Sequence, residues 1–100
     1  IKEYIHKNYA VPSLSVPDVS EYVRLSCSYV CTIFKNETGQ TLNQYLTDYR
    51  IKMSKQFLSD PRYKIADISS RVGYSDGNYF GKSFKKYTGL SPSEYREKLN

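Results

Sequence analysis

Two stretches with helical periodicity, fifty residues apart, each combine small or hydrogen-bonding side chains with lysine on one face. The first face would show Ser28, Cys31, Thr32 and Lys35. The second would show Asn78, Gly81, Lys82, Lys85 and Lys86. Such side chains can approach and hydrogen-bond to base edges, while lysines neutralise phosphates. An ordinary solvated helix more often carries glutamate there, but the only acids nearby, Glu37 and Asp76, lie at the helix ends, so these faces predict contact with DNA.

Other chemistry is poorly supported by the sequence. It has no nucleophile elbow, no phosphate-binding glycine loop and no dyad centred on His6, its only histidine. Cys27 and Cys31 lie four residues apart, and adjacent turns of one helix are a poor place for a disulfide. With His6 far away they also make a weak metal site. We therefore expect reduced cysteines and no enzyme activity, metal or cofactor.

The two faces belong to a longer internal repeat. The sequence FKNETG at residues 34–39 returns as FKKYTG at residues 84–89. Upstream, at an offset of 49, residues 16–27 match residues 65–76, with Asp, Ser and Val recurring in register. Each copy is typical of a short helix, a turn of three to four residues and a second helix, which is the outline of a helix-turn-helix.

Helix start and stop signals divide the rest of the chain. Capping boxes at Ser15, Thr41 and Ser91 and glycines at 39 and 89 mark helix ends. Residues 41–59 contain neither glycine nor proline and predict a rod of roughly 27 Å. The fold class is therefore all-α, with about seven helices and two homeodomain-like helix-turn-helix subdomains joined by a long central helix. The expected division of this single domain (residues 1–100) is 1–40, 41–60 and 61–100.

Composition is that of a globular protein, with 39% hydrophobic and 25% charged residues. The net charge of +5 is uneven: residues 1–49 hold four Lys/Arg and five acids, whereas residues 50–100 hold eleven and five. A basic half raises the expectation of a polyanionic partner. No apolar run approaches the roughly 20 residues of a membrane span. The chain begins without methionine in a helical pattern, and we expect it to be the C-terminal piece of a longer protein.

The eleven tyrosines raise the alternative of base stacking, as in single-strand binders. Four of them recur between the copies, at Tyr29 and Tyr79 and at Tyr45 and Tyr95, which favours packing in the core. Arg50 is expected to pair with Asp48 or a neighbouring helix rather than with DNA.

The segment IADISSRVGYSDGNYFGKSFKKYTGLSPSEYR resembles the signature of the AraC/XylS family of bacterial transcription regulators, and residues 14–51 resemble that family's preceding unit. The resemblance implies two recognition helices in adjacent major-groove segments on one DNA face. It places base-facing residues six, three and two positions before each Phe, at Ser28, Cys31, Thr32, Asn78, Gly81 and Lys82. Phosphates would meet Lys35, Lys85 and Lys86. Family members often have arginine two before the Phe, where this chain has Thr32 and Lys82.

The function implied is sequence-specific binding of double-stranded DNA to regulate transcription in the bacterial cytoplasm. RNA polymerase is a further candidate partner, and no membrane is involved. Family members carry an N-terminal ligand-binding or dimerising domain, or the phosphorylatable receiver of a two-component response regulator. The alternative function is a helical protein-docking module without direct DNA contact.

Overall fold

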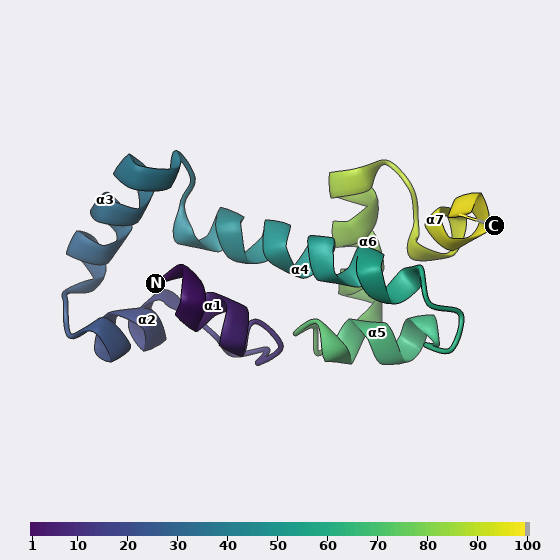
Figure 1. Cartoon of the computed structure of the whole chain (residues 1–100), viewed down its shortest axis with the longest axis horizontal. Coiled ribbons are helices and arrows are strands. Elements are labelled where there is room, and N and C mark those ends of the chain that lie inside the picture. The colour runs from purple at the N-terminus through teal and green to yellow at the C-terminus, as the bar shows by residue number, and fades with distance from the viewer. Residues whose placement is uncertain (100) are drawn as a thin grey trace.

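The computed structural model describes residues 1–99 and contains seven helices and no strand in that range (Figure 1). The prediction of an all-α fold is confirmed. The helices are α1 (Lys2–Asn8), α2 (Val16–Val23), α3 (Cys27–Thr38), α4 (Leu42–Leu58), α5 (Ile65–Arg71), α6 (Gly77–Thr88) and α7 (Pro92–Leu99).

Local capping explains where most of these helices begin. The Ser26 hydroxyl accepts from the Tyr29 N–H at 3.2 Å, which satisfies a free donor of α3. Reciprocal capping boxes start α2 at Ser15, α4 at Thr41 and α7 at Ser91. α6 begins after Asp76, whose Oδ1 accepts from the Asn78 N–H at 2.8 Å.

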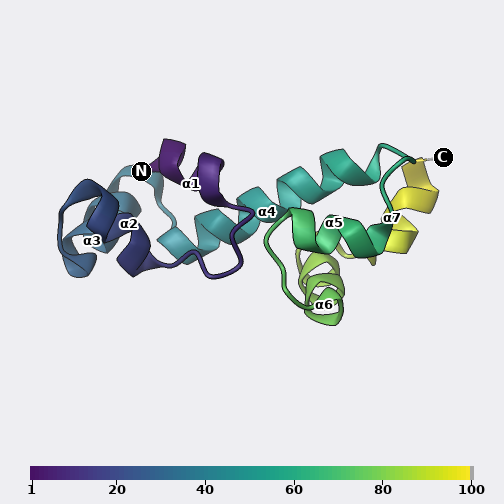
Figure 2. The same ribbon diagram turned by 90° about the horizontal axis from the view of Figure 1, so that it is seen from below.

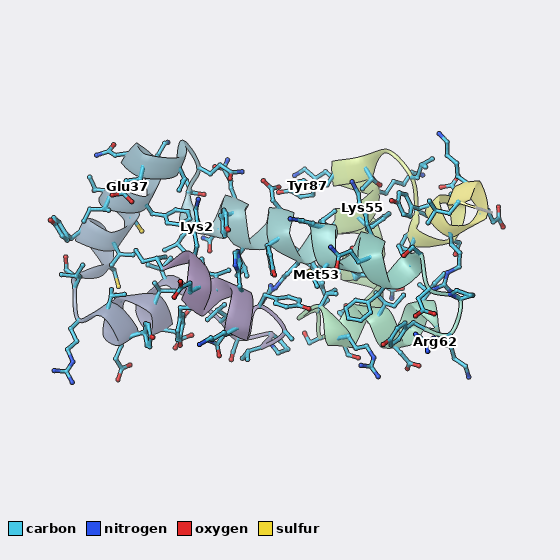
Figure 3. The ribbon with its side chains drawn as sticks, in the orientation of Figure 1. Lys2, Glu37, Met53, Lys55, Arg62 and Tyr87 are labelled. Carbon is cyan, nitrogen blue, oxygen red and sulfur yellow. The ribbon has the colours of Figure 1, made fainter. Side chains whose placement is uncertain are left out.

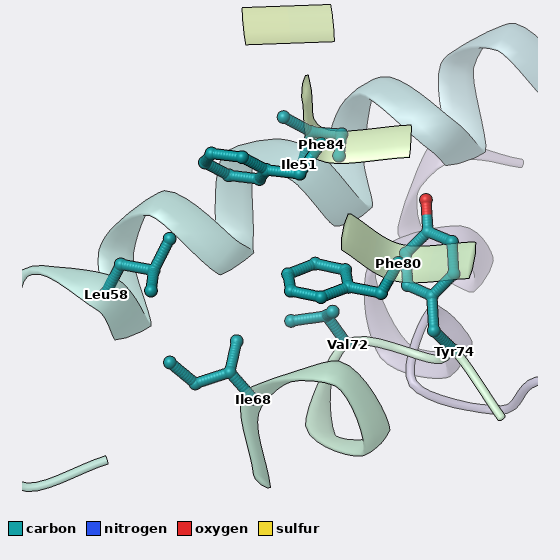
Figure 4. Close-up of a cluster of buried hydrophobic side chains, with 7 residues drawn as sticks. All are labelled: Ile51, Leu58, Ile68, Val72, Tyr74, Phe80 and Phe84. Atoms are coloured by element: carbon teal, nitrogen blue, oxygen red, sulfur yellow. The ribbon is translucent and has the colours of Figure 1, made fainter. Parts of the chain in front are cut away.

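The apolar side chains form two clusters. One joins α1, α2, α3 and the start of α4 through Ile5, Val19, Val30, Phe34, Leu42 and Leu46. The other joins the rest of α4 to α5 and α6 through Ile51, Leu58, Ile68, Val72, Tyr74, Phe80 and Phe84 (Figure 4). α4 therefore contributes to both clusters, and its rigidity links them.

The molecule is elongated, with extents of 44 × 22 × 20 Å. α4 has 17 residues and spans about 26 Å along this axis. α3 and α6 both run across the direction of α4, one near each end (Figure 1). α6 projects on the side of α4 opposite α1 (Figure 2). Within residues 1–99, no helix has both the length and the apolar character needed to cross a bilayer.

Candidate nucleic-acid interface

The second helices of the two repeat copies, α3 and α6, end with the same backbone geometry. Gly39 has φ +78° and Gly89 has φ +83°, the left-handed conformation that glycine adopts at helix C-termini. Gly39 N–H donates to the Lys35 carbonyl at 2.8 Å, and Gly89 N–H donates to the Lys85 carbonyl at the same distance. The repeated Thr-Gly pair thus ends each helix at the same point.

The threonines before these glycines also act alike. The Thr38 hydroxyl lies 2.7 Å from the Phe34 carbonyl oxygen and accepts from the Gln40 N–H at 3.2 Å. Thr88 repeats these contacts, with its hydroxyl 2.8 Å from the Phe84 carbonyl oxygen. At each helix end the threonine hydroxyl thus satisfies a backbone N–H that lies beyond the helix, that of Gln40 or Leu90.

The repeated phenylalanines hold each helix against the core. Phe34 packs edge-on against Tyr45, with ring centroids 5.3 Å apart and planes at 77°. Phe84 packs against Tyr95 at 5.5 Å and 77°. Both phenylalanines are buried, so the corresponding faces of α3 and α6 are fixed in equivalent poses and leave equivalent faces outside.

The turn between the two helices of each copy is built on the same hydrogen bond but not on the same residue. Leu25 N–H donates to the Ser20 carbonyl at 3.0 Å, and Tyr74 N–H donates to the Ser69 carbonyl at 2.9 Å. The left-handed position in this turn is Arg24 (φ 58°) in the first copy and Gly73 (φ 95°) in the second. A Cβ at Gly73 would lie 2.3 Å from the Tyr9 carbonyl oxygen, so only glycine fits.

The candidate base-facing residues lie on the outer faces of the two helices. Ser28, Cys31 and Thr32 are exposed on α3, and Asn78 and Lys82 are exposed on α6. Gly81 is half-buried, and a Cβ added to it would meet nothing within 4 Å. The candidate phosphate contacts Lys35, Lys85 and Lys86 are also exposed. The structure therefore brings each set together on one helix, with the two sets near opposite ends of α4.

The prediction that four recurring tyrosines pack in the core is wrong for two of them. Tyr29 is 54% exposed and Tyr79 is 63% exposed, whereas Tyr45 and Tyr95 are half-buried. Successive helix residues are about 100° apart, so a tyrosine directly before a buried residue lies on the flank of the helix and not on its inner face. The periodic pattern could not separate flank from core, because tyrosine is common in both places.

Arg50 has a structural role that the sequence did not reveal. Its Nε donates to the Tyr9 carbonyl at 2.9 Å, and its Nη2 donates to the Val11 carbonyl at 2.9 Å. The guanidinium carbon lies 5.7 Å from the centre of the Tyr74 ring. Burial lowers the pKa of Arg50, although a guanidinium stays charged at any physiological pH.

These contacts join the segment after α1 to the turn before α6. Tyr9 packs against both apolar clusters, and Gly73 lies against its carbonyl. Contrary to the expectation from the sequence, Arg50 pairs neither with Asp48 nor with a neighbouring helix; it binds two backbone carbonyls of the segment after α1. The partners are about forty positions away in the sequence, so only the fold could identify them.

Within residues 1–99, the cysteines and the histidine do not come together in a metal-binding or catalytic cluster. Cys27 and Cys31 are free and exposed, as expected for reduced cysteines. His6 Nε2 lies 2.7 Å from the Tyr45 hydroxyl, and its ring stacks on Tyr49 with centroids 4.3 Å apart. No group of three metal-ligating side chains occurs in this range.

Comparison with known proteins finds similarity both in sequence and in structure. A model described as a helix-turn-helix domain matches residues 19–98. The chain is 39% identical over 99 residues to the Msm operon regulatory protein of Streptococcus mutans, covering 99% of this chain and 35% of that protein. It is 36% identical over 102 residues to the arabinose operon regulatory protein of Escherichia coli, covering 98% and 35% respectively.

Among solved structures, the C-terminal domain of the two-component response regulator YesN from Fusobacterium nucleatum superposes with a TM-score of 0.91. The two chains are 32% identical, and the match covers 95% of this chain and 92% of that one. The chain spans about a third of the length of the two curated relatives described above.

Two helix-turn-helix units with acid-poor outer faces on one stiff helix define a class, the DNA-binding domains of transcription regulators. Within that class, the chain belongs to the AraC/XylS family. It binds DNA sequence-specifically in the regulation of transcription. The family is not known for enzymatic activity.

Proposed function

We propose that this domain binds one face of double-stranded DNA by placing α3 and α6 in adjacent major-groove segments. The observation that carries the proposal is the equivalent pose of the two helices near the ends of α4. Successive major-groove segments on one face are about 34 Å apart. A central helix of about 26 Å, within a molecule 44 Å long, is a suitable spacer for that separation.

In this arrangement the outer face of each helix meets base edges. Asn78 can pair with adenine through both groups of its amide, and Lys82 can donate to guanine. Ser28, Cys31 and Thr32 form a less discriminating face, since a hydroxyl or thiol accepts several partners. Gly81 permits close approach of the α6 backbone. Lys35, Lys85 and Lys86 neutralise phosphates beside the two grooves.

The two faces differ at every base-facing position, so the target should be asymmetric and about two helical turns long. Selection of bound DNA from a random pool tests this directly. We expect enrichment of one non-palindromic sequence with two conserved blocks about one turn apart. Recovery of no sequence at moderate salt, or of a single block, would contradict the proposed mode.

The full-length protein would use this domain to place a regulator on a bacterial promoter in the cytoplasm, where it would meet RNA polymerase. The similarity to operon regulators and to a response-regulator domain supports either a ligand-binding or a receiver domain as the signal-sensing part. We assign dimerisation of the full-length protein to that part as well. Phosphorylation or sugar dependence of DNA binding by the full-length protein distinguishes the two.

A further inference from the structure

A basic pocket lies between α4 and α6, on the flank of the second recognition helix. Its volume is about 300 Å³, and its walls include three cations, Arg50, Lys82 and Lys86, and the hydroxyl-bearing side chains Thr47, Tyr79 and Ser83. No acidic side chain among residues 1–99 lines it. Ammonium and hydroxyl donors without a competing carboxylate suit a monoanionic ligand.

Other tyrosines complete the pocket. Tyr87 lies on the side of α6 that faces α3 (Figure 3), and it is 48% exposed. Tyr74 forms the floor and is buried, and burial raises the pKa of its phenol. The phenol therefore stays protonated at neutral pH and remains a donor. Tyr79, the tyrosine wrongly predicted to be in the core, is instead an exposed part of this wall.

The first repeat copy lacks three of the residues that line this pocket. Fifty positions earlier, the first copy has Ile33 in place of Ser83, Asn36 in place of Lys86 and Glu37 in place of Tyr87. The pocket beside Phe34 is lined by Glu3 and Glu37 against one lysine, Lys2, so its side chains carry a net negative charge that does not favour an anion. The repeat maintains the pose of the helices, so a basic flank present in only one copy is not needed for folding.

The position of the pocket beside α6 indicates which anion it binds, and this step rests on the binding mode proposed above. A helix in the major groove is flanked by the phosphates of both strands, because the groove is only about 12 Å wide. Lys82 lies on the base-facing side of α6, and Lys86 follows one turn later. The flank formed by Tyr79, Ser83 and Lys86 lines the pocket opposite α4, and Tyr87 of the same pocket lies on the side of α6 that faces α3 (Figure 3). In the proposed binding mode, the DNA strand that passes between the two recognition helices would run along this side of α6.

We infer that the pocket between α4 and α6 binds a backbone phosphate of the DNA strand between the two grooves. Tyr79, Ser83 and Thr47 donate hydrogen bonds to its oxygens, and Lys86 supplies the charge. Arg50 lines the pocket while two of its N–H groups remain committed to backbone carbonyls. The second recognition helix is thereby fixed in depth and rotation by a contact that the first lacks.

Matched variants on the selected DNA site test this inference. Lys86→Gln should reduce the slope of log K against log salt by about 0.9. Lys52→Gln removes the same charge from the opposite side of α4, where Lys52 lies beside His6, and should leave the slope almost unchanged. Tyr79→Phe should weaken binding roughly tenfold, because it removes a hydrogen bond to a charged acceptor. Tyr29→Phe, at the same position of the first copy, should weaken it by less than about twofold.

Neutral methylphosphonate linkages, introduced one at a time between the two conserved blocks, locate the phosphate. One linkage should weaken wild-type binding and have no further effect on Tyr79→Phe or Lys86→Gln. If every linkage affects the variants as much as the wild type, the inference is wrong. If inorganic phosphate saturates the pocket in NMR titrations while no linkage is coupled to it, the ligand is a free anion and the assignment to DNA is wrong. Selection of a DNA site by the wild type separates these outcomes from failure of the binding mode itself.

Discussion

At the scale of single residues, the outer faces of α3 and α6 differ in how strictly they can select a base. Lys82 is a long, exposed donor on α6, at a position where the first copy has the short hydroxyl of Thr32. An ammonium group can discriminate guanine through its acceptors, whereas a hydroxyl can donate or accept. The second copy is therefore expected to supply most of the sequence preference.

Replacement of Lys82 tests this expectation. Lys82→Ala should cost about 1–3 kcal/mol on the preferred site and relax preference at one base pair. Lys85→Ala is the control, since it should weaken binding to all sequences alike and lower the salt slope by about 0.9. Binding measured against single-base variants of the site shows the difference. Uniform weakening by Lys82→Ala would identify Lys82 as a phosphate contact.

A second comparison uses the equivalent positions Asn78 and Ser28. Asn78→Ala should reduce discrimination at one position by about 1–3 kcal/mol, because it removes a bidentate amide. Ser28→Ala should cost less than about 1 kcal/mol, because a neutral hydrogen bond to a solvated base contributes little. Competition assays with each base at the two positions measure both effects. Equal losses would mean that the two copies select bases equally strictly.

At the scale of elements, the helices were predictable where their signals are local. The capping interactions of Ser15, Thr41 and Ser91 join groups three residues apart, so the residue types alone reveal them. Gly39 and Gly89 are equally local. The seven-helix fold could therefore be predicted from the sequence.

Contacts between distant elements could not be predicted in this way. Arg50 binds carbonyls about forty residues away, and the Nη2 of Arg96 donates to the Tyr63 carbonyl at 2.6 Å. A charged side chain in a helix pattern gives no sign of such a partner. Tyr79 shows the same limit, because its place on a pocket wall depends on where α4 lies. The helical pattern placed these residues on the outer faces, the resemblance assigned them to bases or phosphates, and those roles stay predictions.

Replacing the glycines that follow helices by alanine should lower the free energy of unfolding by different amounts. Gly89→Ala should cost about 1 kcal/mol, since a Cβ there meets nothing within 4 Å and only the left-handed backbone is unfavourable. Gly73→Ala should cost about 2–4 kcal/mol, because a Cβ would also collide with the Tyr9 carbonyl. Urea unfolding measures both. Similar losses of unfolding free energy for the two variants would show that the segment after α1 moves aside to accommodate the added Cβ.

Arg24 offers the reverse test, because it occupies the left-handed position without such crowding. Arg24→Gly should raise the free energy of unfolding by about 0.5 kcal/mol, as relief of backbone strain exceeds the entropy that glycine loses on folding. Thermal unfolding should then move upward by a few degrees. A lower midpoint would mean that the arginine side chain contributes more than its exposed position indicates.

At the scale of the whole molecule, the relative placement of the recognition helices depends on α4 and on Arg50. α4 provides the length, and Arg50 ties the segment after α1 to the turn before α6. Two carbonyls held by one planar guanidinium resist rotation of one subdomain about α4. Lysine keeps the charge but cannot donate to both carbonyls in the same fixed geometry.

Arg50→Lys should therefore change tolerance to spacing. One base pair inserted between the two conserved blocks separates them by about 3.4 Å more and rotates them by about 35°. We expect the loss of affinity caused by this insertion to be roughly tenfold smaller in Arg50→Lys, with weaker binding at the natural spacing. Binding to both DNAs measures this. If the insertion penalty is unchanged and affinity falls equally on both DNAs, Arg50 only supports stability.

Because the outer faces of α3 and α6 differ and α4 holds them at a fixed separation, the domain can bind its DNA target in only one orientation. The N-terminus lies with α1 in the first subdomain, and α7 lies at the far end of the molecule (Figure 1). An asymmetric target admits only one orientation, so inverting that target in a promoter would turn the protein end for end. Ile1 would then point downstream where it had pointed upstream. The orientation of the target sequence therefore decides which end of the domain faces a protein bound upstream and which end faces one bound downstream.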